Sequence, residues 1–178
     1  MQIHVFDSFL KDPEAYRREA MQLDYRTYDF PECTFHGIAL SPLTIGVTGI
    51  LETAGLKPEL SFFRKSPKGQ TEPHFIHSDI DMGEWSAILY LNQNPPDGDG
   101  TAFWTHLATG TIGSLIPHER STEGQDPANF EMRRIVPARF NRLLMFPSSY
   151  FHSRALHENW GTGEEARLTQ VTFGKGKL

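Results

Sequence analysis

The chain has 178 residues, of which 38% are hydrophobic and 22% are charged, and its formal net charge is −5. This composition is that of a folded globular chain rather than a disordered one, and the length fits a single domain. The acidic balance argues against binding to duplex nucleic acid, and the lone cysteine, Cys33, excludes an intrachain disulfide and a thiolate zinc cluster.

The opening residues carry neither a basic stretch nor a long apolar stretch, which is the pattern expected of a chain without a secretory leader. No apolar run approaches the roughly twenty residues that a membrane helix needs. We therefore expect a cytoplasmic protein that does not contact a membrane.

Residues 1–60 are expected to form a helical support region. Residues 3–6 alternate in polarity and predict a short strand. The Asp-Pro-Glu sequence at 12–14 supplies a capping side chain, a first-turn proline and an acidic residue, so a helix is predicted from there to about Leu23. A second helix is predicted at 43–51, although its two glycines weaken the pattern.

From residue 61 onward the pattern changes to short strands separated by turn residues. The segment 85–92 is apolar on both faces, which is typical of a central strand covered on both sides. A helix followed by about seven short strands predicts a mainly β barrel or sandwich with helical cover. The strands predicted after residue 60 are 61–64, 85–92, 101–104, 142–146, 150–155 and 166–173.

Residues 106–137 contain glycine, proline and mixed charges with little periodicity. We expect a long surface excursion, and such loops often serve as lids or binding loops. The segment is therefore a candidate lid and specificity element. Four arginines that begin near its end (133, 134, 139 and 142) favour a solvated face over an anion site.

His77 and Asp79 are separated by one residue. In an extended backbone such side chains point to the same side, so both can bind one metal ion. His152, at the start of a late strand, offers a third ligand. Two imidazoles and one carboxylate on one face leave coordination positions open, as in non-heme iron(II) oxygenases, and zinc is the competing metal.

Arg167 begins an alternating strand on which Thr169, Val171 and Phe173 share its face. A guanidinium on an apolar face needs a partner, and a carboxylate suits its geometry best. The alternative is an edge-strand arginine whose charged end reaches solvent.

These motifs resemble those of the 2-oxoglutarate- and iron(II)-dependent dioxygenase superfamily, on its prolyl-4-hydroxylase-like side. The resemblance spans about residues 62–173, and the opening VFDSFLKDPEAYRREA resembles the lead-in helix of small bacterial and phage members. The matching stretches are His77-Ser78-Asp79, WSAILYLN, Gly100-Thr101-Ala102-Phe103-Trp104, FNRLLMFPSSYFHS and ARLTQVTF.

The resemblance implies a double-stranded β-helix (a jelly-roll, cupin-like) spanning 61–173, with an insertion at about 106–137. It implies that iron(II) is bound by His77, Asp79 and His152. Arg167 would bind the distal carboxylate of 2-oxoglutarate, with Thr169 beside it. The prolyl hydroxylases place the basic residue nearer the second histidine.

The implied activity is oxidation of an unidentified small-molecule or peptide substrate by O2, coupled to decarboxylation of 2-oxoglutarate. Two alternatives remain open. One is a cupin-type metal-dependent hydrolase or isomerase that does not use 2-oxoglutarate, against which Arg167 argues. The other is a non-enzymatic jelly-roll binding module, against which the intact ligand set argues.

Other residues receive plainer interpretations. His74 is expected to point away from the metal, and His106 and His118 are expected to be solvated or to contact substrate. His157 could replace His152 as a ligand, but His152 is preferred because it lies in an apolar strand. Tyr90 is a candidate to face the co-substrate, on a strand whose inward side the sequence leaves open. The tryptophans (85, 104 and 160) are expected to be packing residues.

Overall fold

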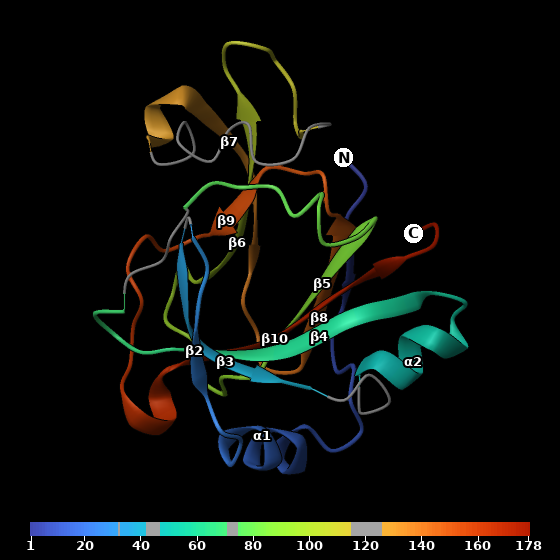
Figure 1. The fold of residues 1–178 in the computed structure, drawn as a ribbon, viewed down its shortest axis with the longest axis vertical. Coiled ribbons are helices and arrows are strands. Elements are labelled where there is room, and N and C mark those ends of the chain that lie inside the picture. Colours follow the sequence, from blue (N-terminus) through green and yellow to red (C-terminus); the bar gives the residue numbers. More distant parts are fainter. Residues whose placement is uncertain (32, 42–46, 71–74, 115–125) are drawn as a thin grey trace.

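The computed structural model describes residues 1–31, 33–41, 47–70, 75–114 and 126–178 (Figure 1). Its helices are α1 (Pro13–Met21), α2 (Val47–Thr53) and two single-turn 3-10 helices, η2 (Pro127–Asn129) and η3 (Gly163–Glu165). Its strands are β1 (His4–Phe6), β2 (Arg26–Asp29), β3 (Thr34–Leu40), β4 (Lys57–Ser66), β5 (Trp85–Tyr90), β6 (Gly100–His106), β7 (Phe130–Pro137), β8 (Arg142–Pro147), β9 (His152–Arg154) and β10 (Arg167–Lys175).

The strands form two antiparallel sheets. The larger has the order β1-β8-β5-β10-β4-β3-β2, and the smaller has the order β7-β6-β9. Among the described residues both helices pack with the larger sheet, and α1 lies beneath it (Figure 1). The predicted mainly β jelly-roll with helical cover is therefore confirmed.

Strand β10 lies at the centre of the larger sheet, between β5 and β4. Thr169 lies opposite Tyr90 on β5 and opposite Arg64 on β4, so these three side chains share one face of the sheet. This face looks toward the interior between the sheets. The side chain of Tyr90 therefore lies on the same face of the larger sheet as the side chains of Arg167 and Thr169.

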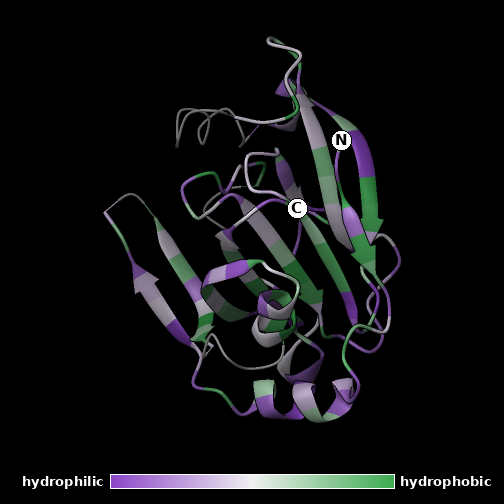
Figure 2. Cartoon of the chain, turned by 90° about the vertical axis from the view of Figure 1, so that its right-hand side faces the viewer, coloured by the Kyte–Doolittle hydropathy of each residue, from purple (hydrophilic) through white to green (hydrophobic). Residues whose placement is uncertain are grey.

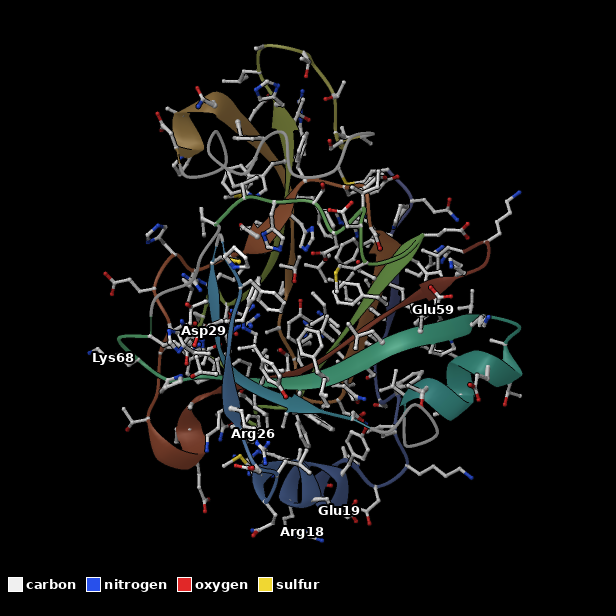
Figure 3. All side chains as sticks on the ribbon, in the orientation of Figure 1. Arg18, Glu19, Arg26, Asp29, Glu59 and Lys68 are labelled. Atoms are coloured by element: carbon white, nitrogen blue, oxygen red, sulfur yellow. The ribbon has the colours of Figure 1, made fainter. Side chains whose placement is uncertain are left out.

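The opposite face of the larger sheet forms the main core. Leu168 is 0% exposed and packs there with residues of α1, α2 and the neighbouring strands. In Figure 2 the strands carry most of the hydrophobic residues, whereas α1 shows hydrophilic residues on its outer side. Arg18 and Glu19, labelled in Figure 3, lie on that exposed side of α1.

A polar network crosses this core. The buried Gln170 accepts a hydrogen bond of 2.6 Å from the Tyr16 hydroxyl of α1 and donates one of 2.9 Å to Ser61 Oγ on β4. The Tyr16 ring also packs against Phe63, with a centroid separation of 5.7 Å. The network fixes α1 to the sheet because each buried polar group has its partner.

The structure corrects two expectations. Residues 1–60 contribute β1, β2 and β3 to the larger sheet and are therefore not only a helical support region. Residues 130–137 form β7 rather than a loop, and they pair with β6 along its length. Residues 131–135 are exposed without alternation, which removes the periodicity that would have revealed this edge strand. The start of the helix predicted at 43–51 lies outside the described residues.

The four arginines expected on a solvated face do not share one environment. Arg142 is buried: it donates to both carboxylate oxygens of Asp7, at 2.6 and 2.9 Å. Arg133 pairs with Glu131, and Arg134 is exposed. None of the described helices is long and apolar enough to cross a membrane.

Candidate metal centre

Three residues from two segments meet between the sheets: His77 and Asp79 from the loop before β5, and His152 from β9. His152 is the first residue of β9, and its backbone N–H and carbonyl both pair with His77, at 2.9 and 3.0 Å. This isolated antiparallel bridge holds the two imidazoles on one side, with ring centroids 4.5 Å apart. The bridge therefore brings residues 77 and 152 together without any side-chain contact being needed.

The ligand atoms of the triad lie within 4.8 Å of one another. Asp79 Oδ2 lies 3.2 Å from His152 Nε2, and Asp79 Oδ1 lies 3.6 Å from His77 Nε2. Ligands bound at about 2.1 Å and at right angles are separated by about 3 Å. The two histidine–carboxylate separations are close to this value, so the three residues could bind one metal ion.

Backbone carbonyls orient both rings. His77 Nδ1 lies 3.2 Å from the carbonyl oxygen of Phe75, and His152 Nδ1 lies 2.9 Å from that of Tyr150. Because a carbonyl oxygen only accepts, each Nδ1 is the donor of this bond, and each Nε2 faces Asp79 as the atom that could bind a metal ion. Such a bond to the outer ring nitrogen is the usual support of a metal-binding histidine.

Asp79 is held by two serines. Ser86 on β5 donates to Asp79 Oδ2 at 3.2 Å, and the Asp79 backbone N–H donates to the carbonyl of Ser148 at 2.8 Å. The hydroxyls of Ser86 and Ser148 also lie 2.8 Å apart. These contacts hold the Asp79 carboxylate beside the start of β5, next to the two histidines.

The environment prepares the donors for a cation. Burial, followed by the neighbouring His152, lowers the pKa of His77 to about 4, so this ring is neutral at neutral pH. Burial would raise the pKa of Asp79, but the charge and hydrogen bond of His152 lower it overall. Burial would likewise lower the pKa of His152, but Asp79 raises it overall. A carboxylate beside two imidazoles fits a divalent cation, which would displace any proton on His152.

Arg167 lies in the same cavity as the triad and is 11% exposed. Its Nε donates to the buried carboxylate of Asp99 at 3.2 Å, which leaves its terminal nitrogens for another group. Asp99 lies in the turn before β6, which packs closely against β7. A Cβ at Gly100 (φ +153°) would lie 2.2 Å from the carbonyl oxygen of Val136, so the turn requires glycine there.

Thr169 is 2% exposed and lines the cavity two residues beyond Arg167. Tyr90 lies opposite it, and its hydroxyl is 2.6 Å from Thr101 Oγ1 on β6, which joins the two sheets. Burial raises the pKa of Tyr90 to about 12, so it is a neutral hydrogen-bonding group.

The cavity that contains the triad has a volume of about 1030 Å³. Two further arginines line it: Arg64, whose guanidinium lies 5.8 Å from the Phe35 ring centroid, and Arg154, which donates to the carbonyls of Leu156 and His157. Burial and then the nearby Arg167 lower the pKa of each to about 10. The sequence patterns had indicated Arg167 as a site residue. They had indicated neither Arg64 nor Arg154 as one, and they had not indicated Asp99, which is the partner of Arg167.

The other histidines considered in the sequence analysis have different environments. His157 is exposed, packs against Phe75 at 4.7 Å and is not part of the triad, as expected. His106 was expected to be solvated or to contact substrate, but it is 4% exposed and packs against Phe130. It ends β6 and is covered by β7, a strand that the sequence did not reveal. His74 and His118 lie outside the described residues.

No protein-family model and no curated protein matches the sequence, but solved structures match the fold. The non-heme α-ketoglutarate-dependent carbocyclase SnoK from nogalamycin biosynthesis aligns with a TM-score of 0.59 and 14% identity, over 96% of this chain and 78% of its own. The epimerase SnoN, in complex with Fe3+, α-ketoglutarate and nogalamycin RO, gives 0.58 and 12%, over 96% and 77%. HygX from Streptomyces hygroscopicus, with nickel, 2-oxoglutarate and hygromycin B bound, gives 0.53 and 13%, over 96% and 81%.

At these identities the likeness concerns the fold, and the prolyl-4-hydroxylase side of the resemblance stays a prediction. The triad of this chain could bind a metal ion, and neighbours of the same fold hold Fe3+ or nickel together with 2-oxoglutarate. This chain has the fold of the non-heme, 2-oxoglutarate-dependent enzymes.

Proposed function

We propose that this protein is an iron(II)- and 2-oxoglutarate-dependent oxygenase. The observation that carries the proposal is the joint presence, in one cavity, of a His-Asp-His triad and of an arginine that is 11% exposed and whose two terminal nitrogens have no bonding partner among the described residues. A hydrolase needs the metal ligands but has no use for the arginine. A co-substrate with a keto acid at one end and a carboxylate at the other uses both.

In this proposal His77 Nε2, His152 Nε2 and one oxygen of Asp79 would hold iron(II). When bound, the iron couples decarboxylation of 2-oxoglutarate to oxidation of the substrate. Ser86 and the two backbone carbonyls keep the ligands in position, so the site is ordered before the metal arrives.

Arg167 would bind the distal carboxylate of 2-oxoglutarate through its terminal nitrogens, while Asp99 holds its Nε. The hydroxyl of Thr169, two positions along β10, lies on the same face and can donate a second hydrogen bond to that carboxylate.

The proposal is tested by adding iron(II) and 2-oxoglutarate to the protein without oxygen. We expect the weak visible charge-transfer absorption of an iron-bound 2-oxo acid, and we expect its loss in His152→Ala. His157→Ala is the matched control, because this histidine is exposed and outside the triad. With oxygen admitted, succinate should appear in wild type and in His157→Ala.

Absence of the absorption in wild type, or its persistence in His152→Ala, would contradict the assignment. A protein that binds iron(II) but gives no absorption with 2-oxoglutarate would instead indicate a hydrolase or isomerase that uses the same ligands. Folding of each variant is checked by thermal unfolding, so that a lost signal is not a lost fold.

A further inference from the structure

The β2–β3 hairpin forms one wall of the cavity that contains the His77-Asp79-His152 triad. Its strands lie side by side at the edge of the larger sheet (Figure 1), and Phe30, Phe35, Ile38 and Leu40 line the cavity. Leu40 lies opposite Phe62 of β4, which lies opposite Val171 of β10. We call the surface made by Phe30, Phe35, Ile38, Leu40, Leu60 and Phe62 the hairpin lobe.

The hairpin lobe differs chemically from the rest of the cavity. The charged side chains that line the cavity come from β4, from the loop before β5, from β9 and from β10, and none comes from the residues of the hairpin that the structure describes. They are Arg64, Asp79, Asp81, Arg154 and Arg167. Arg64 stacks on Phe35 where the lobe meets the arginines. A charged group held in the lobe would lose its hydration without a partner, which costs several kcal/mol or more.

Two of the lobe's large side chains are open to solvent although they line a cavity. Phe30 is 56% exposed and Leu40 is 59% exposed. Exposed apolar residues gathered at the mouth of a cavity are typical of a ligand site. The lobe also contains aromatic rings in contact: Phe30 with Phe35 at 5.9 Å, and Phe62 with Phe173 at 6.1 Å. Such ring edges and faces pack well against a ligand ring.

The cavity has room for two molecules. Pockets for drug-sized ligands measure about 300–1,000 Å³, and this one measures about 1030 Å³. A small dicarboxylic acid between the triad and Arg167 fills only part of it. The space along the hairpin then remains for the substrate.

We propose that the hairpin lobe binds the apolar, ring-bearing part of an uncharged small-molecule substrate. The inference rests on the proposed function, because it assigns the arginine end of the cavity to 2-oxoglutarate. The six lobe side chains carry no hydrogen-bonding group, so the part of the substrate that they contact is apolar. Of the described part of residues 106–137, Ser114 alone lines the cavity.

The inference is tested with probes that share one ring system. Protein loaded with Mn(II) and 2-oxoglutarate is titrated by calorimetry with 2-acetylnaphthalene, which is neutral, and with 2-naphthoate, which is anionic. N-acetyl-phenylalanine amide represents a peptide. We expect the neutral ketone to bind at least about tenfold more tightly than either of the others.

Variants of the hairpin lobe then test whether the neutral ketone binds there. Phe30→Ser and Leu40→Ser are each expected to weaken binding of the ketone by about tenfold. Both side chains are exposed, and the turn bond from the Phe30 N–H to the Cys33 carbonyl is a backbone bond, so the hairpin should persist. Phe6→Ser is the matched control, because Phe6 is 47% exposed and does not line the cavity.

Tighter binding of 2-naphthoate or of the peptide probe would overturn the inference. Equal loss in Phe30→Ser and Phe6→Ser, or no loss in either hairpin variant, would do the same. Failure of the proposed function is seen separately, as a missing charge-transfer absorption with iron(II) and 2-oxoglutarate. A protein that shows the absorption but does not prefer the neutral ring refutes the substrate class alone.

Discussion

The two faces of β10 differ in what surrounds their polar groups. On the core face, Leu168 and Gln170 are enclosed by α1 and the neighbouring strands, and Gln170 is bonded within the protein. On the cavity face, Arg167 and Thr169 line open space beside the metal triad. Adjacent residues of one strand thus serve stability and ligand binding separately, because side chains alternate across a sheet.

Leu168→Ala should show most strongly that the two faces of β10 act independently. Leu168 is 0% exposed, and truncating such a leucine costs about 2–5 kcal/mol because a cavity is left behind. Urea unfolding should show this loss. The affinity of the folded protein for 2-oxoglutarate, followed by the charge-transfer absorption with iron(II), should stay within about twofold of wild type. A large loss of affinity would show that the faces are coupled.

Arg167→Gln should have the opposite effect. Glutamine can still donate to Asp99 but cannot offer a charged pair of donors to a carboxylate. We expect affinity for 2-oxoglutarate to fall about a hundredfold, and unfolding free energy to fall by less than about 2 kcal/mol. The anaerobic titration of the charge-transfer absorption measures the first quantity. An unchanged affinity would remove Arg167 from the co-substrate site and leave the triad unaffected.

Asp99→Asn should give a smaller effect on the cavity face. Its carboxylate holds Arg167 Nε at 3.2 Å, and asparagine keeps an oxygen but not the charge. The terminal nitrogens of Arg167 should then be less well oriented, and affinity for 2-oxoglutarate should fall about tenfold. Metal affinity should not change. Asp97→Asn is the control, because Asp97 lies in the same turn and is exposed. Equal effects of the two variants would argue against positioning by Asp99.

Alternation and spacing made the cavity face readable from the sequence. His77 and Asp79 share a side because they are two residues apart, and Arg167 shares a face with Thr169 for the same reason. Partners across the fold could not be read in this way. Asp99 looked like one polar residue of a turn, and only the packing of the two sheets brings it beside Arg167.

Two of the edge strands, β2 and β7, were the least predictable part of the fold. β2 and β7 lie at sheet edges and are largely exposed, so neither carries the apolar alternation that marks a half-buried strand. Missing these strands also affected the prediction of the candidate site. Without β2 and β3, the hairpin wall of the cavity could not be foreseen. Without β7, His106 was expected in a loop, although it is buried at the end of β6.

Tyr16→Phe should have the smallest effect, and only on the core face. Removing the hydroxyl deletes its 2.6 Å bond to Gln170, while Gln170 keeps Ser61. We expect a loss of about 1 kcal/mol at neutral pH, with the charge-transfer absorption unchanged. Burial raises the pKa of Tyr16 from 10.0 to about 12, so ionisation favours the unfolded state as pH rises through this window. Wild type therefore loses stability between pH 10 and about 12 that Tyr16→Phe does not lose. Urea unfolding across this range should show the two proteins converging, and a constant difference would mean that Tyr16 does not stay protonated in the folded state.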